Sequence, residues 1–467
     1  MVTARSGLVG RRRFLGGVAV GTAGFAMGSI GPAAGSAGAS LPAVEPIPVD
    51  SATLGQGSFQ LFAQSDLNFQ TLIALGGAGI NSAVGEVTTA VAQANAAAGG
   101  ASYQSVYDAM VATGDRLRKA ADEAVEAKHV VTARDRYLRA AQYYNQALFW
   151  VLGTSTPDQE QNVFESMDDA WHESAKRQSP RWEPFTFPWH GHQLPAWFLR
   201  PVGASGRRRT LIMNNGSDGQ NVDMLPQGAT FALERGWNVV IFEGPGQGRT
   251  LFVDKVPFTP AWHEVITPLV DVLQRRKDVE PKQIALVGVS FAGLLVMRAA
   301  AKEHRLAAVV SDPGSISDYD AFPQVLRDAA TGGDKATVNA TWENVIIPGS
   351  DAAQQFDLKK RLEIYTPGAL DEVRAGKVPG DWYDISRAIQ AYDLGDLAQD
   401  VKTRTLVVNY ELEAFYPGQA QELYDRLPGK KDIVTFTVVE GAQYHDAPIG
   451  AQWHGEVVMD WLDEHVR

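Results

Sequence analysis

A sharp turn between a strand-like run and a helix-like run constrains the fold of this chain more than any other feature. Ile284–Val287 is a short apolar run typical of a buried strand, and Leu294–Ala301 has the composition of a helix. Between them lies Gly288-Val-Ser-Phe-Ala-Gly293. A serine in so tight a strand-to-helix turn is lifted clear of the backbone, and the N–H groups that follow it point into the same space. The turn therefore predicts a reactive Ser290. The alternative is a buried serine in a strand–helix turn of another α/β fold.

Composition excludes several classes of function. The chain has 467 residues and a net charge of -12 at pH 7, whereas binding to nucleic acid as a main role needs clustered Lys and Arg. It has no cysteine, which excludes disulfides, thiolate metal sites and cysteine nucleophiles. Beyond the N-terminus, no apolar run reaches the length of about 18 residues that a membrane-spanning helix needs. These properties predict a globular protein without nucleic-acid or integral-membrane partners.

The first 39 residues have the pattern of an export signal. Gly10-Arg-Arg-Arg-Phe-Leu15 matches a twin-arginine motif, Gly16–Gly31 is weakly apolar, and Ala37-Gly-Ala39 matches a cleavage site. The alternatives are a basic tail or a membrane anchor, and the apolar run is short and rich in Gly and Ala for an anchor. We therefore predict a bacterial protein that is exported by the twin-arginine pathway and is secreted or associated with the cell envelope. Residues 40–59 are expected to be a linker.

The rest of the chain divides into a helical part and an alternating part. Residues 60–180 are expected to form a helical cap domain, because up to residue 152 they are rich in Ala, Gln and Leu and lack Pro. Residues 181–467 begin with two strands joined by a turn at 190–192. From there on, strand-like and helix-like runs alternate, apart from a long interruption at about 312–400. Such alternation predicts a mostly parallel sheet with helices on both faces. The antiparallel start and the late interruption fit an α/β-hydrolase fold with a lid inserted between strands 6 and 7.

The individual elements can be placed from the same patterns. We expect strands at 210–214, 237–242, 284–289, 306–311, 403–409 and 433–439. We expect helices at 224–235, 261–275, 419–427 and 455–465.

A serine hydroxyl needs a base to take its proton and a carboxylate to orient that base. In the α/β-hydrolase fold the chain order is nucleophile, acid, histidine. His445 follows the last predicted strand, at the edge of the sheet where the base belongs, whereas His454 and His465 are expected at the surface. Two candidates for the acid, Glu411 and Glu413, follow the strand at 403–409. We favour Glu413 because it lies deeper in the loop, and Glu411 stays open as the alternative.

An oxyanion formed on the substrate needs two N–H donors. One should come from Phe291, directly after the serine. The other should come from the glycine-rich loop Gly216-Ser-Asp-Gly219, where Ser217 and Asp218 are both candidates. The run 243–248 resembles a phosphate-binding loop but lacks a Gly-Lys-Ser/Thr ending, so we expect a structural turn.

Further substrate contacts are less specific. Glu243 and Asp312 end strands at the same sheet edge as the serine and could contact substrate or cap the structure. Tyr137 and Tyr144, in the helical part, could line a pocket. Other aromatic residues could do the same or belong to the core: Tyr319, Phe322, Trp342 and Trp382. No cofactor and no metal are predicted, because the pair His190 and His192 has no third ligand at a telling spacing.

Taken together, these motifs resemble a known group of α/β-hydrolases, the dihydroxypseudooxynicotine hydrolase and FrsA-like group, with the fungal polyketide-shortening hydrolases. The resemblance covers about residues 60–467. It rests on the helical segment at 133–144 and on the motifs Gly216-Ser-Asp-Gly, Phe242-Glu-Gly-Pro-Gly-Gln-Gly, Gly288-Val-Ser-Phe-Ala-Gly, Phe415-Tyr-Pro-Gly-Gln and Glu440-Gly-Ala-Gln-Tyr-His. It implies Ser290 as nucleophile, Glu413 as acid and His445 as base. Members of the group usually have Asp at the position of Glu413 and Gly-Gly at Ala292-Gly293.

The resemblance does not fix the bond that is cleaved. The group includes enzymes that cut carbon–carbon bonds beside a ketone and others similar to esterases or peptidases. The leading hypothesis is a serine hydrolase acting on an ester or similar acyl bond of a small to medium organic molecule. The alternatives are a retro-Claisen type C–C hydrolase of a ketone or polyketide-like substrate, and a catalytically inactive binding protein of the envelope. Members of the group often form dimers, so a homodimer is an expectation that the sequence leaves open.

Overall fold

The structure is a computed structural model that describes residues 60–64 and 66–467. The predicted export signal and linker therefore lie outside the described residues. Within these residues, no helix has the length and apolar character needed to cross a membrane.

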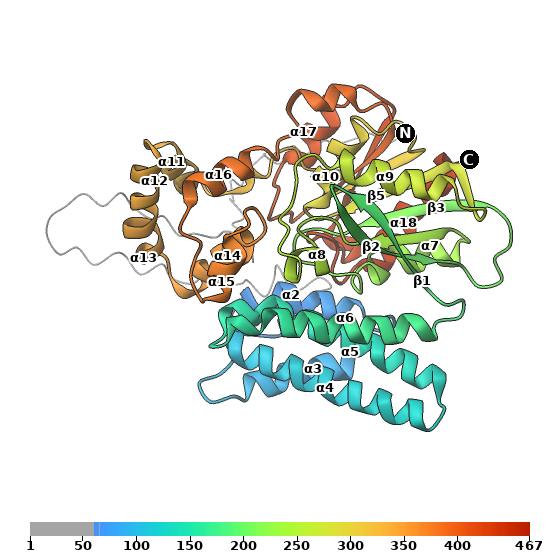
Figure 1. The fold of residues 1–467 in the computed structure, drawn as a ribbon, viewed down its shortest axis with the longest axis horizontal. Coiled ribbons are helices and arrows are strands. Elements are labelled where there is room, and N and C mark those ends of the chain that lie inside the picture. Colours follow the sequence, from blue (N-terminus) through green and yellow to red (C-terminus); the bar gives the residue numbers. More distant parts are fainter. Residues whose placement is uncertain (1–59, 65) are drawn as a thin grey trace, which may run out of the picture.

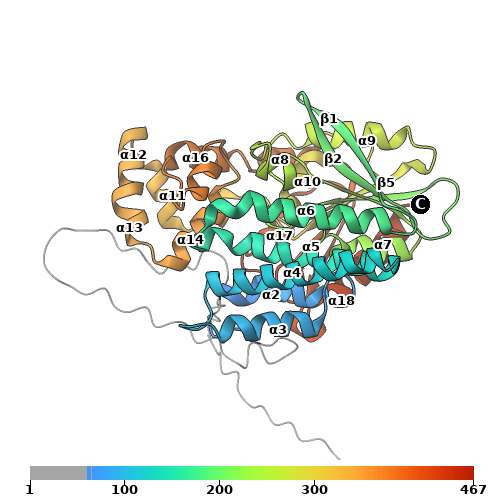
Figure 2. The same ribbon diagram turned by 60° about the horizontal axis from the view of Figure 1, so that its bottom comes forward.

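Among the described residues, five α-helices precede the sheet and pack together along one side of it (Figures 1 and 2). They are α2 (Asp66–Gly76), α3 (Val84–Asn95), α4 (Tyr103–Glu126), α5 (Val130–Trp150) and α6 (Glu160–Arg177). The start of α4 shows why the sequence folds this way. Ser102 and Ser105 form a capping box, and Val106, Met110 and Leu117 recur on one buried face. We call this group of helices the cap.

The sheet has eight strands in the order β1-β2-β4-β3-β5-β6-β7-β8. β1 and β2 are antiparallel to their neighbours, and the other strands pair in parallel. Every residue of β4 and of β6 is buried, and because successive side chains point to opposite faces, both faces of the central sheet are covered. The predicted α/β-hydrolase fold is therefore confirmed. The strands are β1 (Glu183–Trp189), β2 (His192–Leu199), β3 (Arg208–Asn214), β4 (Asn238–Phe242), β5 (Val279–Val289), β6 (Ala308–Asp312), β7 (Arg404–Tyr410) and β8 (Lys431–Phe436).

The helices between and after the strands lie close to their predicted places, except α8, which was not predicted. They are α7 (Thr230–Glu234), α8 (Gly248–Phe252), α9 (His263–Gln274), α10 (Ala292–Ala300), α17 (Gln419–Arg426) and α18 (Ala451–His465). One predicted helix begins with an irregular turn, and one predicted strand is shorter than expected. The helix expected from residue 224 begins with a π-turn, Leu225–Ala229, because Gly228 adopts a φ of 157° that interrupts the helix. The last strand ends at Phe436, because Glu440 and Thr437 cap each other in a short turn that leaves Val439 exposed.

A helical insertion separates β6 from β7, at the place predicted for the lid. It contains α11 (Gln324–Thr331), α12 (Lys335–Thr341), α13 (Ile347–Gly349), α14 (Ala352–Leu362), α15 (Ala369–Arg374) and α16 (Trp382–Gln390). In Figure 1 these helices, drawn in orange, form a lobe beside the sheet, and α14 and α15 lie on its side toward the cap. We call this insertion the lid.

Candidate active site

Ser290 lies at the end of β5 in a strained turn, with a φ of 57°. Its N–H donates to the carbonyl of Asp312 over 2.6 Å and to Oδ1 of Asp446 over 3.2 Å. The small neighbours are required by space. A Cβ on Gly288 would lie 2.2 Å from the carbonyl oxygen of Ala292, and one on Gly293 would lie 2.2 Å from that of Pro313. The turn therefore has the geometry of a nucleophile elbow.

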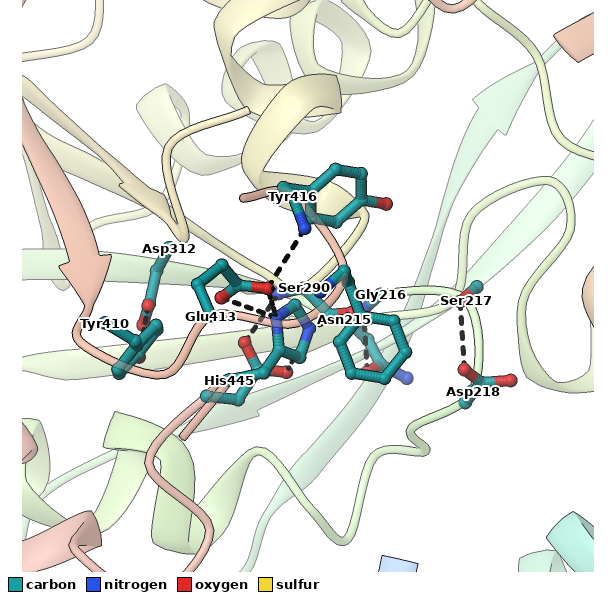
Figure 3. A network of polar contacts seen from close by, with 12 residues as sticks. Asn215, Gly216, Ser217, Asp218, Ser290, Asp312, Tyr410, Glu413, Tyr416 and His445 are labelled. Carbon is teal, nitrogen blue, oxygen red and sulfur yellow. Dashed lines mark hydrogen bonds and ion pairs between the residues drawn. The ribbon is translucent and has the colours of Figure 1, made fainter. Parts of the chain in front are cut away.

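The structure brings Ser290, His445 and Glu413 together from three separate loops (Figure 3). Nε2 of His445 lies 3.0 Å from Oγ of Ser290. Nδ1 of His445 lies 2.9 and 3.0 Å from the two carboxylate oxygens of Glu413. Both side chains are only 4% exposed. Contacts of this length and order are those expected between a nucleophile, its base and an orienting acid.

Glu413, and not Glu411, occupies the position of the acid. Its Oε1 accepts hydrogen bonds from the N–H groups of Phe415 and Tyr416, at 2.8 and 3.1 Å, which fix the carboxylate against the imidazole. Glu411 is exposed, and its Oε2 instead accepts from the N–H of Val438 at 2.9 Å. The geometry therefore favours Glu413 as the acid.

Asp446 is a further carboxyl group at the site, and it was not among the predicted site residues. Its Oδ2 lies 3.4 Å from Nε2 of His445, on the side of the ring that faces Ser290. Burial lowers the pKa of His445, but the negative charges of Asp446 and Glu413 outweigh burial and raise the pKa to about 9. Burial raises the pKa of Asp446 to about 7. The only signal in the sequence is its position next to His445.

The predicted oxyanion donors lie on both sides of the nucleophile. Gly216 approaches so closely that a Cβ there would lie 2.7 Å from Cβ of Ser290. Ser217 and Phe291 line one cavity together with Ser290, as expected of two donors that share an oxyanion. The N–H of Gly216 is occupied by Oδ1 of Asn215 at 2.8 Å. Asp218 does not line that cavity, so Ser217 fits the second donor better than Asp218 does.

Two small cavities flank Ser290, and Arg361 and Phe415 line both of them. The first, about 60 Å³ in volume, lies against α2, α5 and α14 and contains His445; we call it the cap-side cavity. The second, about 40 Å³, contains Ser217, Phe291 and Asp318; we call it the lid-side cavity. Each has room for a few non-hydrogen atoms.

Four predicted substrate contacts, Tyr137, Tyr144, Glu243 and Asp312, line neither cavity at Ser290. Tyr137 and Tyr144 point into the cap, where their hydroxyls donate to Asp122 and Asp115 at 2.5 and 2.7 Å. Glu243 is buried behind the oxyanion loop, where it accepts from the N–H of Arg249 at 2.8 Å. Tyr137 and Tyr144 therefore stabilise the packing of the cap helices, and Glu243 stabilises the start of α8.

Asp312, the fourth of these residues, is buried beneath the nucleophile in a hydrogen-bonded group. Its carboxylate accepts from the hydroxyl of Tyr410 at 2.5 Å and contacts Nε2 of His454 at 2.7 Å. The expectation of a surface His454 is therefore wrong, because its ring is 1% exposed and its partner lies in the core. This group supports the strand end that carries the Ser290 turn.

The side chain of His190, in the predicted surface turn, pairs with Glu264, with 2.7 Å between Nε2 and Oε2. Among the described residues, no group of three or more His, Cys, Asp or Glu side chains is arranged to hold a metal ion.

Comparison with known proteins agrees with this architecture. The model of the alpha/beta hydrolase family matches residues 224–458, half of the chain. The chain belongs to that family. Alpha/beta hydrolase psoB of Aspergillus fumigatus is 28% identical over 390 residues, covering 77% of this chain and 85% of that protein. Hydrolase LUC6 of a Fusarium species is 27% identical over 429 residues, covering 87% and 97% of the two chains.

The crystal structure of 2,6-dihydroxy-pseudo-oxynicotine hydrolase superimposes with a TM-score of 0.61. It covers 85% of this chain and 96% of that one at 18% identity, so it supports a shared fold. The resemblance to this group is confirmed, and the chain is a hydrolase. The two relatives compared by sequence, psoB and LUC6, are fungal. The bacterial source and the export pathway of this chain stay predictions.

Proposed function

We propose that this hydrolase is a serine hydrolase that cleaves an ester or similar acyl bond of a small organic molecule. The observation that carries the proposal is the contact of Ser290 with His445, which in turn contacts Glu413, at the end of a strained strand-to-helix turn. A serine so placed can be deprotonated as it attacks.

The steps follow from the geometry. His445 takes the proton of Oγ as Ser290 attacks the acyl carbon, and Glu413 stabilises the imidazolium that forms. The N–H groups of Phe291 and Ser217 hold the oxyanion. His445 then gives the proton to the leaving group, and Ser290 keeps the acyl group. Water, activated by the same imidazole, releases the acid and restores the serine.

Labelling with a fluorophosphonate probe tests this proposal. The native protein should be labelled at Ser290 and should hydrolyse p-nitrophenyl esters, and Ser290→Ala should do neither. His445→Ala should lower turnover by at least about a thousandfold, and a drop below about tenfold would place the base elsewhere. A native protein that is neither labelled nor active would instead support the third hypothesis, a binding protein on a hydrolase scaffold.

A second candidate is cleavage of a carbon–carbon bond beside a ketone, and Asp446 favours it. The leaving carbanion of such a reaction needs a nearby proton donor. Asp446 lies in the cap-side cavity beside His445, and burial raises the pKa of its carboxyl, which favours the protonated form that can donate. Cleavage of aryl β-diketones without turnover of p-nitrophenyl esters would favour this candidate over the first.

A further inference from the structure

If the proposed function holds, each of the two cavities binds a different part of the substrate. Phe291 and Ser217, the proposed oxyanion donors, line the lid-side cavity, so the acyl group lies toward that side. His445 lines the cap-side cavity and must protonate the leaving group. The leaving group therefore enters the cap-side cavity, and the chemistry of that cavity determines which leaving groups fit.

Carboxyl groups outnumber cationic groups in the lining of the cap-side cavity. Its lining includes five of them but, besides His445, only one cation, Arg361. That guanidinium forms an ion pair with Asp218, one of the five. Lys360, the preceding residue on α14, is bonded to Glu363 at 2.6 Å and does not line the cavity. The five carboxyls belong to Asp66, Asp218, Asp223, Asp357 and Asp446.

Two of these carboxyls lack the partners that buried carboxyls usually have. Oδ2 of Asp223 accepts from Gln220 N–H and Asn145 Nδ2 at 2.9 and 2.7 Å, but its buried Oδ1 has no donor within the described chain. Asp223 is 4% exposed. Asp357, on α14, is half-buried; its carboxylate makes no hydrogen bond to a described residue, and desolvation raises the pKa of this carboxyl to about 6. Both groups would be stabilised by a bound cation that donates hydrogen bonds.

The walls of the cavity are aromatic. Phe69 and Phe149 come from the cap, Phe356 from the lid, and Phe415 from the loop beside His445, where its ring centroid lies 4.4 Å from that of the imidazole. Phenyl faces attract ammonium groups, most strongly where water is excluded. The volume of about 60 Å³ suits a short group with few heavy atoms.

We propose that the cap-side cavity binds a leaving group that carries a protonated amine, with Asp357 as its counter-ion and the phenylalanine rings as its walls. The natural substrate is then an ester or related acyl derivative of a short amino alcohol. An uncharged polyol would also donate hydrogen bonds, but it would leave the excess negative charge uncompensated. The charge of the lining therefore favours the amine.

A matched pair of esters tests the proposal. The acetates of 2-(dimethylamino)ethanol and of its uncharged isostere 3-methylbutanol share size and acyl group, and only the first is cationic at neutral pH. We expect the ratio of kcat/KM, cationic over neutral, to fall at least about tenfold in Asp357→Asn, because the counter-ion of the amine is lost from the cavity. Asp371→Asn is the matched control. This residue is also on the lid, but it is exposed and outside both cavities, so the ratio should not change.

The outcomes separate this inference from the proposed function. If Ser290 is labelled and neutral esters are hydrolysed, but Asp357→Asn leaves the ratio unchanged, the amine site is wrong and the serine hydrolase stands. If no ester is hydrolysed and Ser290 is not labelled, titration calorimetry with 2-(dimethylamino)ethanol still decides the inference. Binding that is lost in Asp357→Asn supports the site, and absence of binding to the native protein overturns it. Should Asp357→Asn fail to fold, Phe149→Leu, which removes one wall, should lower the same ratio.

Discussion

His445 contacts carboxylates through both ring nitrogens, which distinguishes it from a base held by one acid. Glu413 lies against Nδ1, and Asp446 lies 3.4 Å from Nε2, close to the serine oxygen. A negative charge on each side stabilises the imidazolium, and this explains why the pKa of His445 rises to about 9 although burial alone would lower it. Because only the neutral ring can accept the proton of Ser290, the charge of Asp446 should control the pH dependence of the reaction.

The first prediction concerns Asp446→Asn. In the native protein, kcat/KM should rise with increasing pH as His445 loses its proton, with a midpoint well above the usual histidine range. Removing the charge of Asp446 destabilises the imidazolium, so the midpoint should move to lower pH. The measurement is the pH profile of kcat/KM for a p-nitrophenyl ester. Asp460→Asn, an exposed charge on α18, should leave the midpoint in place, because water and salt screen it. A midpoint that stays or rises in Asp446→Asn would contradict this account.

The second prediction separates the two glutamates. Glu413→Gln should lower kcat by at least about a hundredfold, because an amide can neither fix the reactive tautomer of His445 nor stabilise its charge. Glu411→Gln should stay within about twofold of the native protein, since this side chain contacts only a surface turn. Steady-state kinetics of both variants, with thermal melts to verify folding, provide the comparison. Equal losses in the two variants would refute the assignment.

At the residue scale, chain order made the central residues predictable. Ser290, Glu413 and His445 each follow a strand, so the edge of a parallel sheet brings them together whatever the loops do. The positions of Asp357 and Asp223 in the cap-side cavity were not predictable. They line the same cavity only because of how the lid packs beside the oxyanion loop. Tyr137 and Tyr144 misled the prediction because a tyrosine on a helix has the same sequence signature whether it faces a pocket or a neighbouring helix.

Among the elements, the loop after β3 and the turn after β5 depend on each other. Gly216 lies where a side chain would meet Cβ of Ser290 at 2.7 Å and the carbonyl oxygen of Val289 at 2.9 Å. The two backbones can therefore lie side by side only with glycine at this position. This close approach brings Ser217 to the cavity that Ser290 and Phe291 line.

The third prediction follows from this contact. Gly216→Ala should push the loop away from the nucleophile and lower kcat by at least about a hundredfold, the loss expected when an oxyanion donor is displaced. Thermal unfolding should show that the fold persists. Gly85→Ala on α3 is the matched control, because no atom lies within 4 Å of the added Cβ, and it should retain full activity. Native activity in Gly216→Ala would remove this loop from the oxyanion site.

The regular elements were more predictable than their ends. Buried strands such as β4 are continuous apolar runs, and the predicted limits of β4 agree with the structure to within one residue, whereas β5 begins at Val279, five residues before its predicted start. The end of β8 was missed because a local exchange of hydrogen bonds between Thr437 and Glu440 competes with strand pairing. His454 was predicted at the surface because its position near the start of the last helix does not indicate that it contacts Asp312, which is buried in the core.

At the scale of the whole molecule, the cap and the lid meet beside the site and close it. Phe356 on α14 stacks on Tyr103 of the cap with ring centroids 4.3 Å apart. Trp150 of the cap also stacks on Phe356, with ring centroids 5.7 Å apart. Arg374 of the lid donates to the buried Glu160 of α6 at 2.8 Å. Sequence patterns could predict both helical segments but not this contact, because it joins residues more than 200 positions apart.

The last prediction tests whether the aromatic stack holds the lid on the cap. Phe356 is 3% exposed, so Phe356→Ala should destabilise the protein by about 3–5 kcal/mol through lost burial and the cavity left behind. Because Phe356 is also a wall of the cap-side cavity, KM for small esters should rise and the lid should become easier to cleave in limited proteolysis. Val345→Ala, a partly exposed lid position, should change stability by less than about 0.5 kcal/mol and leave both other measurements unchanged. If Phe356→Ala lowered the melting temperature but changed neither KM nor the cleavage pattern, the stack would serve stability alone, and closure of the site would depend on the polar contact between α6 and α15.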